Sequence, residues 1–85
     1  FNLSNAHPNP FNPITSFTLN VSEPGYVSVQ VYNIKGQVEA TLVSGYMNAN
    51  SYNLQWNASE ASSGMYVVTA VSVGSVSTQK LLLIK

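Results

Sequence analysis

The chain has 85 residues, with three lysines, three glutamates, a formal net charge of zero and no cysteine. This length corresponds to one domain, and the absence of cysteine excludes disulfides and thiolate sites. Nucleic-acid phosphates are bound by clustered Lys and Arg and anionic membranes by basic patches, so we expect neither as a partner. The longest apolar run, Leu81 to Ile84, is far shorter than the about 20 residues that span a bilayer.

The first unusual segment is "PNPFNP", from Pro8 to Pro13, which we call the collar. Proline cannot donate to a sheet ladder, so we expect the collar to cross the edge of a sheet without pairing fully, with Phe11 as its apolar anchor. Such a segment protects an edge strand from pairing with other chains; a role in recognition is the alternative. The chain begins at Phe1 with no visible signal peptide, so we expect it to be a piece of a longer protein.

After the collar, apolar and polar residues alternate almost throughout, which is typical of half-buried strands. Six strands are expected, and turn signals, among them Ser44-Gly45 and Gly74, separate them. A seventh strand is expected from residues 2–6 or 45–47. The last two of the six are the most apolar, so we expect them to be central. The six expected strands are 16–21, 27–32, 37–42, 51–56, 65–73 and 75–84.

This pattern predicts an all-β domain, an antiparallel sandwich or barrel without helices. Successive side chains of a strand point to opposite faces, so residues of one parity are expected to form the core. The residues expected inside are Phe17, Leu19, Val29, Val31, Leu42, Leu54, Trp56 and Tyr66.

Nothing in the chain resembles a catalytic site, and we expect the domain not to be an enzyme. The single histidine, His7, lies in the proline-rich segment, there is no aspartate, and no Gly-x-Ser-x-Gly elbow is present. We expect no cofactor. Zinc would have one histidine and no cysteine to use, and calcium would have only Glu23 or Glu60 with backbone carbonyls.

Aromatic side chains leave carbohydrate binding open as an alternative. Trp56, Tyr52 and Tyr66 share the inward parity and are expected to belong to the core. Tyr32 and Tyr46 are expected to be exposed, and could stack on a sugar.

Four segments, in this order, resemble one known family: "PNPFNP", "VSVQVYNIKGQVEATLVSG", "WNASEASSGMYVV" and "STQKLLLIK". They are similar to the C-terminal sorting domain of the type IX secretion system (type A), over residues 6–85. The resemblance implies an immunoglobulin-like antiparallel β-sandwich of about seven strands, with residues 1–85 as a single domain and 1–13 as linker and collar. It also implies a set of recognition residues: Pro8, Asn9, Pro10, Phe11, Asn12, Pro13, Gly36, Gly64, Tyr66, Lys80 and Lys85.

The function implied by the resemblance is that of a secretion signal. An N-terminally fused cargo would pass through the periplasm of a Gram-negative bacterium and cross the outer membrane through the secretion machinery. A surface sortase would then act on it, so that the cargo is secreted or stays at the cell surface. The final strand, residues 76–84, would offer an edge for β-augmentation. The alternatives are a carbohydrate-binding module and a structural immunoglobulin-like module of a secreted enzyme.

Overall fold

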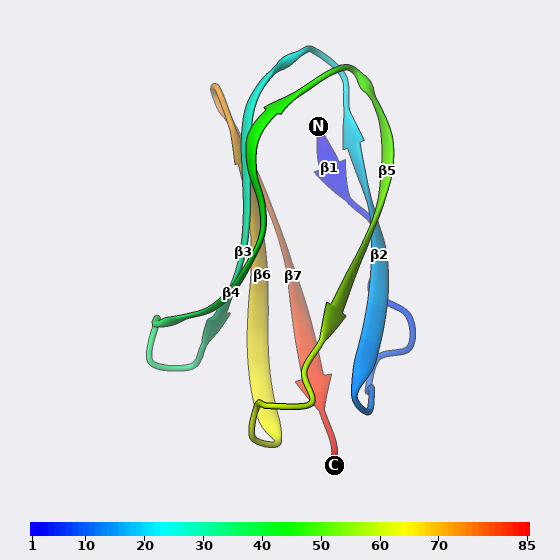
Figure 1. Ribbon diagram of the computed structural model, residues 1–85, viewed down its shortest axis with the longest axis vertical. Coiled ribbons are helices and arrows are strands. Elements are labelled where there is room, and N and C mark those ends of the chain that lie inside the picture. The colour runs from blue at the N-terminus through cyan, green and yellow to red at the C-terminus, as the bar shows by residue number, and fades with distance from the viewer.

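Two antiparallel sheets pack face to face in the computed structural model, which covers residues 1–85 (Figure 1). One sheet has three strands in the order β1-β2-β5, and the other has four in the order β4-β3-β6-β7. The expected all-β sandwich of about seven strands is confirmed. The structure contains no helix that could span a membrane. The strands are β1 (Asn2–Leu3), β2 (Ile14–Val21), β3 (Gly25–Asn33), β4 (Val38–Met47), β5 (Asn50–Asn57), β6 (Gly64–Ser72) and β7 (Ser75–Leu83).

The core lies between the two sheets and is built by the alternation that the sequence shows. Leu19 of β2 is completely buried, as are Val29 and Val31 of β3. Within the larger sheet, Val29 pairs with Ala70 and Val31 with Val68, so small and medium apolar side chains line the inner face. Burial of this kind is the main favourable contribution to folding in a chain that has no disulfide.

Two expectations about the strands are wrong. Ser44-Gly45 is not a turn: β4 continues to Met47, and Gly45 pairs with Val27. The last strand is not central, because β7 lies at the edge of the larger sheet and only β6 is central. The high hydrophobicity of β7 suggested a central position, but the inner side chains of an edge strand are buried as deeply as those of a central strand. The expected hairpin at Gly74 is present, since β6 ends and β7 begins on either side of Val73-Gly74.

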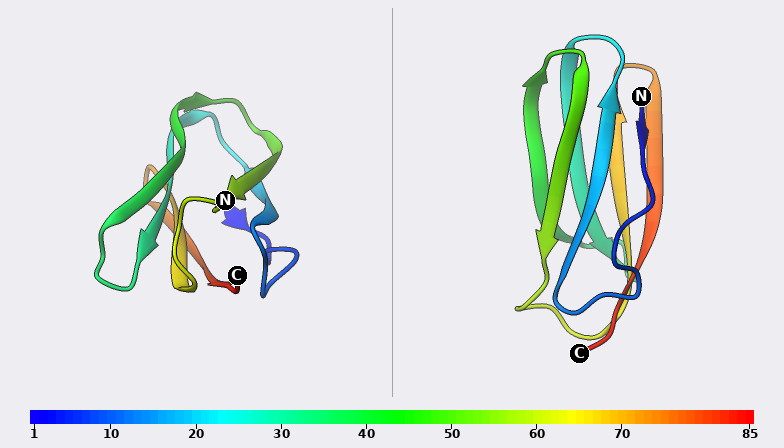
Figure 2. Two further views of the ribbon diagram at one scale, coloured as in Figure 1. Left: turned by 60° about the horizontal axis from the view of Figure 1, so that its bottom comes forward. Right: turned by 90° about the vertical axis from the view of Figure 1, so that its right-hand side faces the viewer.

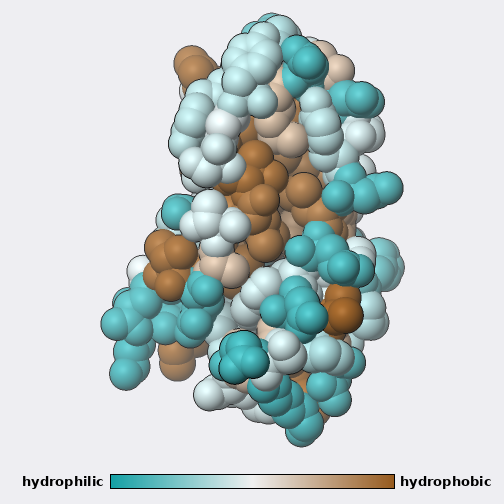
Figure 3. All heavy atoms as spheres, in the orientation of Figure 1, coloured by the Kyte–Doolittle hydropathy of each residue, from teal (hydrophilic) through white to brown (hydrophobic).

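The two lateral sides of the sandwich differ. On one side β1 and the collar lie between β2 and β7, and the N-terminus is found there (Figure 2, right). On the other side, β4 and β5 are edges of different sheets, and no segment covers the space between them. Leu42 and Leu54, both expected inside, are only partly buried because they lie on this open side. Figure 3 shows apolar residues gathered along the middle of this face.

A matched pair of leucines tests this asymmetry. Leu19→Ala should lower the free energy of unfolding by about 3 kcal/mol, because it leaves a cavity in an enclosed core. Leu54→Ala should lower it by about 1 kcal/mol, because water already reaches this side chain. Urea unfolding followed by tryptophan fluorescence measures both. Equal losses would contradict an open side between β4 and β5.

Candidate functional site

The N-terminal segment leads from the edge of one sheet to the edge of the other. His7 pairs with Ser16 of β2 through two backbone hydrogen bonds of 2.8 Å each. One residue later, the hydroxyl of Thr15, which is fully buried, donates to the carbonyl of Pro8 at 2.8 Å. The inward parity that Thr15 shares with Phe17 was the sequence signal for its burial. The start of the collar is therefore attached to β2.

Asn9 attaches the collar to β7. Its amide nitrogen donates to the carbonyl of Lys80 at 3.0 Å, and its amide oxygen accepts from the N–H of Leu82 at 2.9 Å. One side chain thus satisfies a donor and an acceptor of the edge strand, as a neighbouring strand would. Asparagine suits this position because its side-chain amide carries both groups that a peptide carries.

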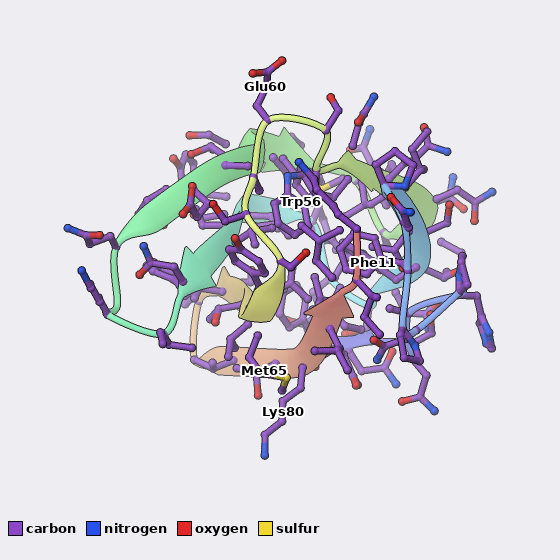
Figure 4. All side chains as sticks on the ribbon, turned by 90° about the horizontal axis from the view of Figure 1, so that it is seen from below. Phe11, Trp56, Glu60, Met65 and Lys80 are labelled. Atoms are coloured by element: carbon purple, nitrogen blue, oxygen red, sulfur yellow. The ribbon has the colours of Figure 1, made fainter.

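Phe11 completes the attachment with its backbone and its ring. Its N–H donates to the carbonyl of Leu82 at 2.9 Å, and its carbonyl accepts from the N–H of Ile84 at 3.0 Å. The ring, which is 2 % exposed, lies 5.7 Å from that of Trp56, and Trp56 contacts Tyr66 edge to face at 5.1 Å. Figure 4 shows Phe11 and Trp56 inside this end of the sandwich. The expected role of Phe11 as apolar anchor agrees with this geometry.

Side chains of β7 extend the same attachment to β1. The hydroxyl of Ser77 accepts from the N–H of Leu3 at 3.0 Å, and the amide of Gln79 donates to the carbonyl of Leu3 at 3.2 Å. β1 therefore lies beside the first half of β7 and is bonded to its side chains. The sequence did not predict these two contacts, because both residues occur in an ordinary alternating strand.

The end of the chain lies beside the turn between β5 and β6. The N–H of Lys85 donates to the hydroxyl of Ser63 at 3.0 Å, and its ammonium donates to the carbonyl of Ser59 at 2.7 Å. Gly64 starts β6 opposite Leu83, with a φ of 151° that other residues rarely adopt. Lys80 is exposed and points away from the sandwich (Figure 4).

Gly36 lies apart from this group, in the turn between β3 and β4. Its φ is 80°, and its N–H donates to the carbonyl of Asn33 at 3.0 Å. The side-chain oxygen of Asn33 accepts from the N–H groups of Lys35 and Gln37. The turn is thus shaped by Asn33, and Gly36 supplies the left-handed conformation that it needs.

Tyr66 has a shifted pKa, although nothing around it forms catalytic machinery. Burial raises the pKa of its hydroxyl, and the negative charge of Glu39 raises it further. The hydroxyl donates to the carbonyl of Ser62 at 2.6 Å. The proton is therefore held firmly, and Tyr66 fixes the turn before β6.

The expected recognition residues differ in their position and in their exposure to solvent. The collar, Gly64, Tyr66, Lys80 and Lys85 gather around the end of β7, whereas Gly36 lies elsewhere. Phe11 and Tyr66 are buried, so they shape the surface and do not form it. The exposed members are Pro8, Asn9, Pro10, Asn12, Gly36, Lys80 and Lys85.

The geometry gives little support for sugar binding or metal binding. Tyr32 pairs with Val38, and Tyr46 with Tyr26, at the two ends of β3. Six residues of strand separate the two rings by about 20 Å, so they do not form one platform for a sugar. No group of three or more His, Cys, Asp or Glu side chains is placed to hold a metal ion.

Comparison with known families decides the identity. Residues 5–85 match the family described as secretion system C-terminal sorting domain. The chain belongs to this family. It is a sorting signal for type IX secretion, a domain that is not itself catalytic, and it directs an N-terminally fused cargo to the secretion machinery and out to the cell surface or the medium. No curated protein and no solved structure matches the chain.

Asn9→Ala tests the attachment of the collar to β7. The variant loses two hydrogen bonds and should lower the free energy of unfolding by about 1–2 kcal/mol. The N–H of Leu82 should exchange with solvent faster, which NMR measures directly. Asn12→Ala is the control, because Asn12 is also exposed but makes neither bond. An unchanged exchange rate at Leu82 would contradict the assigned contact.

Tyr66→Phe tests the raised pKa. Above about pH 10 the unfolded chain loses this proton first, so the free energy of unfolding of the parent falls as pH rises. At neutral pH the variant should be about 1 kcal/mol less stable, since it lacks the hydrogen bond to Ser62. This difference should shrink as the pH rises above about 10. Urea unfolding across that range measures it, with Tyr46→Phe as the exposed control; a constant difference would refute the shift.

Proposed function

We propose that the secretion machinery recognises the exposed residues around the end of β7. The observation that supports this proposal most directly is the convergence of the collar and the C-terminal residues on one strand. Asn9 and Phe11 bond to β7 between Lys80 and Ile84, while Lys85 bonds to the turn before β6. Segments more than 70 positions apart in the sequence thus form one surface, which exists only when the domain is folded.

This surface has the character of a recognition patch. Exposed prolines present rigid apolar rings that lose little conformational freedom on binding. Lys80 and Lys85 add two of the three lysines of the chain. A partner therefore meets a rigid collar with a few distinct charges, and can distinguish it from an ordinary β-sandwich.

The β7 edge itself is less accessible than the sequence suggested. β-Augmentation there requires free backbone groups, but Asn9 and Phe11 already bond to the backbone of the second half of this strand, and β1 lies beside its first half, bonded to the side chains of Ser77 and Gln79. We therefore favour docking onto the side chains over addition of a strand at β7.

We further propose a route for the attached cargo. The folded domain, residues 1–85, would be recognised in the periplasm, escorted to an outer-membrane translocon and then cut by a surface sortase. Asn2, Leu3 and His7 pair with β2, and a protease needs an unpaired, extended segment. Cleavage would therefore fall upstream of β1, and any enzymatic activity would belong to the cargo.

An export assay with three lysine variants tests the proposal. Residues 1–85 are fused behind a periplasmic reporter in a host that has the type IX machinery, and the exported fraction is measured. Lys80→Ala and Lys85→Ala should each reduce export about fivefold, as expected for loss of a contact worth about 1 kcal/mol. Lys35→Ala, in the turn between β3 and β4, should leave export unchanged.

Circular dichroism should show that all three variants fold, since surface substitutions usually change stability by less than about 0.5 kcal/mol. Equal export of the three variants would show that Lys80 and Lys85 do not belong to the recognised surface. Retention of the parent fusion inside a competent host would overturn the sorting function of this chain.

A further inference from the structure

A second surface lies on the open side of the sandwich, across from the collar. At its lower end is a hollow of about 240 Å³, lined by residues of β4, β5 and the turn that follows β5. Glu39 lies at its β4 side and Glu60 at its turn side, with Trp56 and three alanines, Ala40, Ala58 and Ala61, between them. Figure 4 shows Glu60 extending into solvent from the turn after β5, with Trp56 inside the sandwich.

The charge of this hollow is one-sided. Two of the three glutamates of the chain, which has no aspartate, line it, and no lysine or arginine does. Glu39 accepts one hydrogen bond, from the amide of Asn33 at 3.3 Å. The ammonium of Lys85 is occupied with the carbonyl of Ser59. In a chain with so few charges, two carboxylates that line one hollow favour a cation there.

Trp56 carries a hydrogen-bond donor that no group of the protein uses. The side chain is 5 % exposed, yet its indole N–H donates no hydrogen bond within the protein, whereas Tyr66 beside it does. No buried polar side-chain atom of the structure lacks a partner, so this N–H retains contact with solvent. The hollow between Glu39 and Glu60 is the only one of the three surface hollows that Trp56 lines. A ligand in this hollow would therefore lie against Trp56.

Above the hollow, apolar side chains lie between the edges of β4 and β5 (Figure 3), and we call this strip together with the hollow the groove. Its apolar lining includes Leu42 and Leu54, which are partly exposed. β4 pairs only with β3, and β5 only with β2, so each has one edge that no strand of the chain occupies. An extended polypeptide can bond to such an edge while its alternate side chains enter the apolar groove.

We propose that this groove binds an extended segment of a secretion-machinery protein, with a lysine or arginine of that segment between Glu39 and Glu60. The alkyl stem of such a residue would pack on Trp56 and the alanines while its cation meets the carboxylates. The indole N–H would donate to a carbonyl of the bound segment. The assignment to the machinery rests on the sorting function.

The position of the groove favours a separate protein over the cargo. The cargo joins the domain at its N-terminal end, which lies beside β7, on the side away from β4 and β5 (Figure 2, right). A second copy of the chain is a poorer occupant. Residues 38–57, which include both open edges, contain no lysine or arginine, so a symmetric dimer through this face would offer no cation to Glu39.

A peptide titration tests the surface in isolation. The probe is the extended peptide acetyl-Lys-Val-Thr-Val-Thr-amide, and its counterpart has norleucine in place of lysine. Trp56 is the only tryptophan, so its indole N–H gives a single, assigned NMR signal. The lysine peptide should shift this signal in a saturable way, and the norleucine peptide should bind at least about threefold more weakly.

Three glutamine variants provide the matched comparison. Glu39→Gln and Glu60→Gln should each weaken binding of the lysine peptide about twofold to fivefold, as expected for exposed charge pairs. Glu23→Gln, in the turn between β2 and β3, should leave it unchanged. Absence of a saturable shift, equal binding of both peptides, or an equal effect of Glu23→Gln would overturn the proposal. A shift that depends on protein concentration alone would assign the groove to a second copy and overturn it too.

Export of the reporter fusion separates this inference from the sorting function. The double variant Glu39→Gln, Glu60→Gln should reduce export about fivefold or more relative to Glu23→Gln. If the parent fusion is exported and the double variant is exported equally, the sorting function stands and the groove is not a machinery site. If the parent fusion is retained, the sorting function fails, and with it the assignment of this occupant to the machinery.

Discussion

The attachment of the collar to β7 is the interaction on which the rest of the structure depends. Without it, β7 would be a nine-residue edge strand with free backbone groups and an apolar inner face, the usual starting point for unwanted pairing between chains. Asn9 satisfies two of those groups, and Phe11 adds a parallel bridge to Leu83. The same contacts hold the N-terminal segment against both sheets, so one lateral side of the sandwich is closed.

That closure explains why the other side can remain open. β4 and β5 are held by single neighbours, and water reaches Leu42 and Leu54 between them. A small domain can tolerate this exposure because its fully buried residues lie on the inner faces of β2, β3, β6 and β7, away from the open side, among them Leu19, Val31, Val68 and Leu81. The two lateral sides of the domain therefore differ: one joins the cargo and carries the collar, and the other offers unpaired strand edges.

The sequence predicted most of the strands, because period-two alternation records the parity of burial directly. It also predicted the anchoring role of Phe11, since prolines on both sides prevent ordinary strand pairing. The prediction failed where pairing between strands distant in the sequence decides whether a residue belongs to a strand and which strand lies at the edge. Gly45 reads as a turn residue but belongs to β4, and β7 reads as central but is an edge. The prolines marked the collar in the sequence, whereas Glu39 and Glu60, 21 positions apart, come to line one hollow only through the fold.

The three packed aromatic rings join the two surfaces physically. Phe11 comes from the collar, Trp56 from the small sheet and Tyr66 from the large one. The ring centroids of Phe11 and Trp56 lie 5.7 Å apart, and those of Trp56 and Tyr66 lie 5.1 Å apart. Trp56 also forms the floor of the hollow between Glu39 and Glu60. A ligand bound there would contact the same ring against which Phe11 packs. Since Phe11 also holds the collar on β7, the row of rings connects the open side to the closed side by direct contact, and both surfaces exist together only in the folded domain.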